Sequence, residues 1–164
     1  MVSSVNTHQA ILVVSFLTFL LFLASAQTSW AEAKKGTATY VGSQKCKECH
    51  EEQFESYSKY SKKAHSFSSI KVMQKGLTKQ ELKKCYDCHT TGYGKPGGFR
   101  SEAETPHLKN AGCEACHGPG SLHVKSEDAS DIKGSLSVSD CQHCHNKARV
   151  GSFRYRPLIY GGGH

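Results

Sequence analysis

Four short motifs of the form Cys-x-x-Cys-His account for every cysteine in the chain. They occupy residues 46–50, 85–89, 113–117 and 141–145, and they read CKECH, CYDCH, CEACH and CQHCH. On a helical turn, positions i, i+3 and i+4 share one face, so two thiols and one imidazole project to the same side. Two such thiols can each add to a vinyl group of one porphyrin, and the imidazole can then ligate the iron. We therefore interpret each motif as an attachment site for haem c.

This interpretation assigns the cysteines to thioether bonds and one histidine per motif to the proximal face of each iron. The attachment residues are Cys46, Cys49, Cys85, Cys88, Cys113, Cys116, Cys141 and Cys144. The proximal ligands are His50, His89, His117 and His145. Three alternatives for the cysteines are two Cys₄ zinc sites, four disulfides, and redox dithiols. None of them requires a histidine after every second cysteine, so the sequence favours four haem c groups.

Other histidines are candidates for the opposite, distal face of each iron. The distal candidates are His65, His107, His123 and His164. His143 lies between the two thiols of the fourth motif, so we expect it to point away from that haem and to be a surface residue. Met73 is the only methionine beyond the N-terminal region. Four histidines for four irons predict mostly bis-His ligation, which gives lower potentials than His/Met ligation.

The composition explains why the fold needs these groups. From Lys34 onward, Phe, Leu, Ile and Val together fall below the roughly 20% at which a charged chain usually stays disordered. Such a chain cannot bury enough apolar surface to offset its conformational entropy, which excludes an ordinary self-sufficient globular enzyme. Attached porphyrins supply the missing surface. We expect one mainly α, loop-rich domain over 34–164, a small multihaem cytochrome c fold organised around four covalently attached haems.

Residues 1–33 have the composition of an export signal. The apolar run at 11–23 is short for a membrane span of about 20 residues, and small residues at 24–26 and 31–33 fit a signal-peptide cleavage site. We predict cleavage after Ala33, with an uncleaved anchor as the alternative. Either outcome exports the rest of the chain, to the periplasm or to the extracellular space. No second apolar run follows, so we expect no stable membrane insertion of the mature chain.

Capping residues indicate the helices that carry the motifs. The capping box at 78–81 opens a helix that contains the second motif, and the pattern at 139–142 predicts another box for the helix of the fourth. Residues 46–60 are expected to form one helix, with Phe54 and Tyr57 on the face of the first motif histidine.

Glycines and prolines predict the loops between these helices. The segments 92–98 and 118–120 are predicted loops, and the second ends the helix of the third motif. A short helix after it would present His123 to a haem other than that of the third motif. Strand signals are few and are confined to 39–41 and 153–155.

Three stretches of the sequence resemble the tetrahaem cytochrome c554-type family. They are Tyr-Val-Gly-Ser at 40–43 ahead of the first motif, CYDCHTTGY at 85–93, and GCEACHGPGSLH at 112–123. The resemblance covers most of residues 40–145. It implies closely packed haems in a helical fold, and electron transfer between exported redox enzymes and membrane partners.

The same resemblance bears on the distal ligands. By match to the family, His65 and His123 are distal ligands. His107 precedes the third motif where family members vary, and some members leave one haem five-coordinate, so full ligation is open at His107. The segment 155–160 resembles the family's closing segment, which a ligand histidine often follows, but here three glycines precede His164.

The sequence is compatible with three functions from different classes. The first is an electron-transfer protein, the second is a self-associating subunit of an extracellular conductive filament, and the third is a haem enzyme acting on small nitrogen compounds at an open iron. No Cys-x-x-Cys-Lys variant marks a catalytic haem, so we predict electron transfer rather than catalysis. The net charge of +7 is balanced in part by haem propionates. We therefore expect redox protein partners and no nucleic acid.

Overall fold

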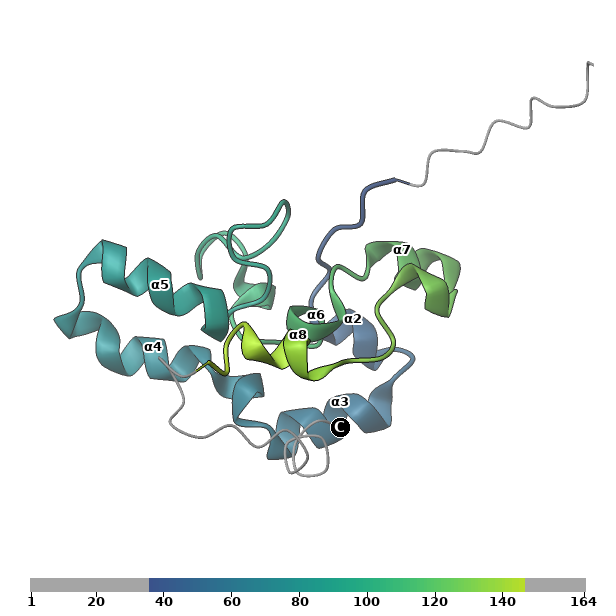
Figure 1. The fold of residues 1–164 in the computed structure, drawn as a ribbon, viewed down its shortest axis with the longest axis horizontal. Coiled ribbons are helices and arrows are strands. Elements are labelled where there is room, and N and C mark those ends of the chain that lie inside the picture. The colour runs from purple at the N-terminus through teal and green to yellow at the C-terminus, as the bar shows by residue number, and fades with distance from the viewer. Residues whose placement is uncertain (1–35, 147–164) are drawn as a thin grey trace, which may run out of the picture. The chain divides into compact units, whose positions relative to one another are not determined.

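The computed structural model describes residues 36–146, which fold into short helices joined by loops (Figure 1). The described part of the chain contains no β-strand, and none of its helices is long and apolar enough to cross a membrane. The strand expected at 39–41 is therefore wrong. The predicted signal at 1–33, the strand signal at 153–155 and the distal candidate His164 lie outside the described residues.

The helices are short and follow one another along the chain. The α-helices are α2 (Ser43–Lys47), α3 (Glu51–Tyr60), α4 (Phe67–Met73), α5 (Lys79–His89), α6 (Glu114–His117), α7 (Ser121–Ser126) and α8 (Val138–Gln142). The 3₁₀ turns are η1 (Lys62–His65), η2 (Gln74–Gly76), η3 (Pro106–Leu108) and η4 (Ala129–Asp131). This is the mainly α, loop-rich fold that the composition predicted.

The apolar core is small. It consists of Phe67, Ile70, Phe99 and Leu108, each no more than 6% exposed, with half-buried side chains from α5 around them. It lies where α4 packs against α5 (Figure 1). Ordering the chain costs conformational entropy. So few buried side chains cannot offset that cost for the whole described region, as the composition also indicated.

Two carboxylates fix where the helices of the second and fourth motifs begin. The predicted box of α5 is confirmed: the Thr78 amide donates to the Glu81 carboxylate at 2.9 Å, and the Glu81 amide donates to the Thr78 hydroxyl at 3.3 Å. The predicted box of α8 is wrong by two residues. There Asp140 accepts from the amide and hydroxyl of Ser137 at 2.8 and 2.9 Å. An ionised acceptor forms the stronger bond and is favoured at a helix N-terminus.

The single helix expected over 46–60 is wrong, because the chain breaks between α2 and α3. His50 has φ −118° and ψ 52°, outside the helical region, and its carbonyl accepts the first bond of α3 from the Phe54 amide at 3.0 Å. Glu51 and Glu52 occupy the first turn of α3 and Lys47 the last turn of α2, where their charges favour separate helix ends. The first motif histidine therefore lies at the start of a helix instead of within one.

Both predicted glycine-rich loops are confirmed. In the first, a Cβ on Gly98 would meet the Gly92 carbonyl at 1.7 Å, so the loop closes only around a residue without a side chain. In the second, Gly118 has φ 79° and ends α6, and α7 begins three residues later. The predicted short helix that carries His123 is therefore α7.

Candidate functional site

All four Cys-x-x-Cys-His motifs have the local geometry that attachment requires. In the first, third and fourth motifs, the histidine amide donates to the carbonyl of the first cysteine at 2.8, 3.0 and 2.9 Å, which closes one helical turn. The second motif forms the last turns of α5. Each motif therefore presents both thiols and the imidazole on one side of a turn. All eight thiols are free of disulfides, and the described residues contain no group of three or more side chains that could hold a zinc ion.

The first motif lies against the third. The thiols of Cys46 and Cys113 lie close enough to interact, which raises the pKa of Cys46 and lowers that of Cys113. The Cys113 amide also donates to the Ser43 hydroxyl at the start of α2, at 3.1 Å. Two attachment sites that are far apart in the sequence are thereby adjacent in the fold.

The second motif lies against the fourth in the same way. Burial and a hydrogen bond with the Cys88 thiol raise the pKa of Cys144. Beside them, Nε2 of His143 lies 3.1 Å from a carboxylate oxygen of Asp87. Each of these residues lies between the two thiols of its motif. The His143 side chain is 63% exposed, in agreement with the expectation that it is a surface residue.

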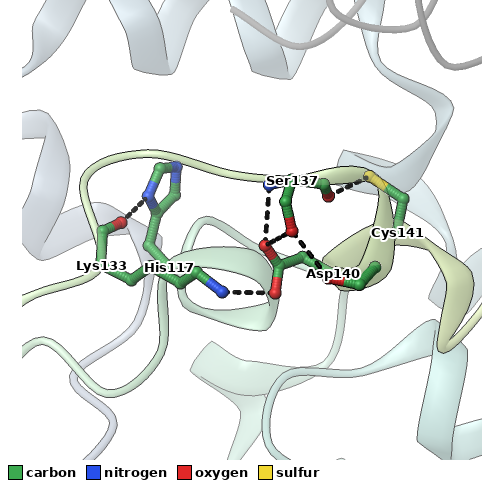
Figure 2. Close-up of polar contacts among 6 residues, drawn as sticks. His117, Lys133, Ser137, Asp140 and Cys141 are labelled. Carbon is green, nitrogen blue, oxygen red and sulfur yellow. Dashed lines mark hydrogen bonds and ion pairs between the residues drawn. The ribbon is translucent and has the colours of Figure 1, made fainter.

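A polar network joins the third motif to the fourth (Figure 2). The Lys133 carbonyl accepts from Nδ1 of His117 at 2.6 Å, and the Lys133 ammonium pairs with Asp140, which caps α8. Cys141, the first thiol of the fourth motif, is bonded to the Ser137 carbonyl in the same turn. The thiols of the third and fourth motifs also interact electrostatically. The four motifs thus form one contiguous series in the order first, third, fourth, second.

Backbone carbonyls set the tautomers of two proximal candidates. His89 Nδ1 lies 2.9 Å from the Ser66 carbonyl, and His117 Nδ1 lies 2.6 Å from the Lys133 carbonyl. A carbonyl can only accept, so Nδ1 carries the proton and Nε2 carries the lone pair that binds metal. Burial lowers the pKa of His145, which favours the neutral form that a ligand requires.

The rings of His50 and His123 lie close together and nearly parallel. Their centres are 6.1 Å apart and their planes are 19° from parallel. An imidazole binds metal through a lone pair in its ring plane, so the two rings would share one iron only through their nitrogen-bearing edges. A spacing of about 6 Å is compatible with such a pair, at about 2 Å for each imidazole–metal bond. His123, the distal candidate in α7, lies beside His50 of the first motif. It is paired with that residue although the third motif directly precedes α7 in the chain.

Two other distal candidates, His65 and His107, lie on the surface of the described region. His65 is exposed, and its Nε2 lies 2.8 Å from the Ser58 carbonyl. His107 is exposed in η3 and covers Gly42, where a Cβ would meet the His107 ring at 3.1 Å. The fold thus brings one distal candidate onto a proximal ring, and it places His107 beside the helix of the first motif.

Sequence reasoning missed Glu114, the first variable residue of the third motif. Its side chain is 2% exposed, and its carboxylate accepts from the amides of Val41, Gly42 and Gly120 at 2.7–3.1 Å. Glu114 is not one of the motif's cysteines or its histidine, and a glutamate between two motif cysteines is typical of an exposed helical turn. The motif therefore gives no reason to expect it to be buried. The only local signal is the glycine-rich turn that follows, whose amides need acceptors.

These features define a multihaem c-type cytochrome. The family model described as cytochrome c554 and c-prime matches residues 45–118. The match spans the first three attachment motifs, and the resemblance noted in the sequence is confirmed. The cofactor is haem c, four groups per chain, in agreement with the eight cysteines.

Two related proteins show the extent of the similarity. Cytochrome c-554 of Nitrosomonas europaea is 35% identical over 130 residues, which cover 70% of this chain and 53% of that protein. The chain therefore spans about half the length of this curated relative. The solved reduced state of cytochrome c554 from Nitrosomonas europaea is similar at 27% identity and a TM-score of 0.49, over 67% of this chain and 66% of that one.

Proposed function

We propose that this chain is an exported tetrahaem electron-transfer protein. The observation that carries the proposal is the contiguous series of four attachment motifs, joined by thiol contacts between the first and third and between the second and fourth. Haem c, when bound, supplies reversible one-electron chemistry at its iron. The chain's own contribution is to attach, ligate and space four such groups. A series of adjacent sites suits the transfer of electrons through the protein, whereas a single open site would suit catalysis.

The attachment and proximal residues follow from the motifs. Each pair of cysteines would hold one group through two thioethers, and the adjacent histidine would bind its iron through Nε2. The backbone bonds to His89 and His117 orient those rings and make the ligating nitrogens more basic. Burial lowers the pKa of His145, which favours its neutral form.

For the first site we assign His123 as the distal ligand opposite His50, on the 6.1 Å spacing of their rings. His65, His107 and His164 remain the candidates for the other three irons. Ligation at every iron by two histidines would hold the potentials low and leave no position open for substrate.

The two ends of the series differ in charge. Near the first motif, Lys45 pairs with Glu48, and Lys47 pairs with Glu51 and Glu55. Near the second motif, exposed lysines without an ion pair in the described part of the chain gather on η2, α5 and the loop after it. These are Lys75, Lys79, Lys83, Lys84 and Lys95. Two of them border a shallow hollow beside Asp87 and Tyr93.

We infer that an acidic redox protein docks at the second-motif end. Charge complementarity would speed association and make it fall with ionic strength. The rate of electron exchange with an acidic acceptor should drop as salt rises. Lys83→Gln/Lys84→Gln should flatten that dependence, whereas the paired Lys45→Gln should not. An equal loss in both variants would contradict this docking face.

Export follows from the residues before the domain. We propose that 1–33 is a signal peptide and that 34–164 is the mature tetrahaem domain, because haem c is attached outside the cytoplasm. The mass of the purified holoprotein tests both points at once: it should equal residues 34–164 plus four haems. A mass that includes residues 1–33 would indicate an uncleaved anchor.

Coulometric and kinetic measurements on the holoprotein test the function itself. We expect four electrons per chain on full reduction, fast reoxidation by a second redox protein, and a monomer by light scattering. Steady turnover of nitric oxide or hydroxylamine would contradict the proposal in favour of an enzyme. Ordered fibres whose assembly needs a ligating histidine would contradict it in favour of a filament subunit.

A further inference from the structure

Glu114 is a buried carboxylate with no role in attachment or ligation. Its Oε1 accepts from the amides of Val41 and Gly120 at 3.0 and 2.8 Å, and its Oε2 accepts from those of Val41 and Gly42 at 3.1 and 2.7 Å. Three backbone amides, two from before the first motif and one from after the third, therefore converge on one side chain.

Two of these amides belong to the residues at which the ligand-bearing helices begin. Gly42 is the N-cap of α2, which carries the first thiol of the first motif and leads to His50. Gly120 is the N-cap of α7, which carries His123. The helices that deliver both rings of the first site therefore start on the same carboxylate.

The contacts leave little freedom for either helix start. Gly42 and Gly120 are both buried, and a Cβ on Gly120 would meet Glu114 Oε1 at 3.3 Å. Hydrogen bonds to a carboxylate are about twice as strong as those between neutral groups. Without the carboxylate, three amides in this buried turn would lose their acceptor, which the backbone around them would relieve by moving.

We propose that Glu114, from the third motif, is a positioning residue for the first haem site, where it holds α2 and α7 so that the rings of His50 and His123 stay beside each other. The inference rests on the proposed ligation of one iron by these two histidines. It makes ligation at the first site depend on a residue of the third.

The test compares Glu114→Gln with His123→Ala in the oxidised holoprotein by low-temperature EPR. Glutamine keeps the size of the side chain but replaces one acceptor oxygen with a donor. We expect both variants to convert about one haem in four from low spin to high spin. The double variant should show no further conversion, and added imidazole should restore the low-spin signal. The control is Glu52→Gln, which removes an exposed carboxylate from α3 near the same motif and should leave the spin states unchanged.

The other outcomes would contradict either the positioning role of Glu114 or the assignment of His123 as a ligand. If His123→Ala creates a high-spin haem and Glu114→Gln does not, the positioning role is wrong and the ligand assignment stands. If His123→Ala changes nothing, the ligand assignment itself is wrong. Conversion of several haems in Glu114→Gln, or a gain that imidazole does not reverse, would indicate general destabilisation and overturn the proposal.

A second variant covers the case in which Glu114→Gln yields no holoprotein. Glu114→Asp keeps the charge but is shorter by one methylene, so it cannot reach Gly42 and Gly120 together. It should mature with four haems and show partial conversion of a single haem. Fully low-spin spectra in Glu114→Asp, identical to those of the unmodified protein, would then overturn the positioning role.

Discussion

Nε2 of His143 lies 3.1 Å from the Asp87 carboxylate, although each is a variable residue of a different Cys-x-x-Cys-His motif. The side chains are 49% and 63% exposed, and exposed pairs contribute only about 0–1 kcal/mol. The pair therefore marks the adjacency of the second and fourth motifs more than it stabilises it. We predict that His143→Ala matures with four haems, keeps its spin states and melts within a few degrees of the unmodified protein. A new high-spin signal in this variant would make His143 a ligand.

Ser66 is predicted to support the second site through bonds that the haem motif itself cannot supply. Its hydroxyl donates to the His89 carbonyl and accepts from the Ala111 amide, both at 3.0 Å, in a buried position. Ser66→Ala leaves that amide unsatisfied, which costs about 1–3 kcal/mol. The unfolding temperature of the holoprotein should fall by several degrees Celsius per kcal/mol. The control is Ser69→Ala, an exposed serine of α4, the helix that Ser66 precedes as N-cap, and this variant should unfold at an almost unchanged temperature.

The network around Asp140 predicts an acid-sensitive contribution to stability. Bonds to Lys133 and then to Ser137 lower the pKa of the Asp140 carboxyl to about 2, against an ordinary value of about 3.9 in the unfolded chain. A lowered folded-state pKa stabilises the fold above pH 4, and the contribution disappears as the pH falls through 2. Asp140→Asn should therefore be less stable than the unmodified protein at neutral pH, and the two denaturation midpoints should converge near pH 2. A gap that persists at pH 2 would show that the charge of Asp140 is not responsible.

Removal of haem should abolish the fold. The core of Phe67, Ile70, Phe99 and Leu108 is too small to order the described region on its own. Chain expressed without haem attachment, or with the cysteines replaced by alanine, should lack the helical circular dichroism of the holoprotein and show no cooperative melting. The holoprotein under identical conditions is the control. A cooperative transition in the haem-free chain would mean that the porphyrins are bound to a fold that already exists.

The sequence was most informative where a feature depends on nearby residues. The motif turns, the cap of α5 and the loops around Gly98 and Gly118 follow from spacing and backbone chemistry within a few positions. The break at His50 and the start of α8 were missed because competing caps lay within the same few residues. In α8, Ser137 and Ser139 are both acceptable N-caps, and only the position of Asp140 relative to the first decides between them.

The distant relationships could not be read in this way. Nothing near Glu114 indicates that its partners are the amides of Val41 and Gly42, which lie far back along the chain. The pairing of His50 with His123 is equally invisible in the spacing, because four irons and several histidines allow many assignments. The types of ligand were predictable from composition, whereas their pairing required the fold.

In the series of four attachment sites, the fourth motif connects the third motif to the second. The first and second motifs are neighbours in sequence, yet they stand at opposite ends of the series, and each reaches the middle through a motif that is synthesised later. A chain that ended before Val138, the first residue of α8, would keep three complete motifs, but the second would reach the third only through flanking residues such as Ser66 and Thr91. The thiol contacts that join the two pairs of motifs are thus complete only when the last attachment site has been synthesised.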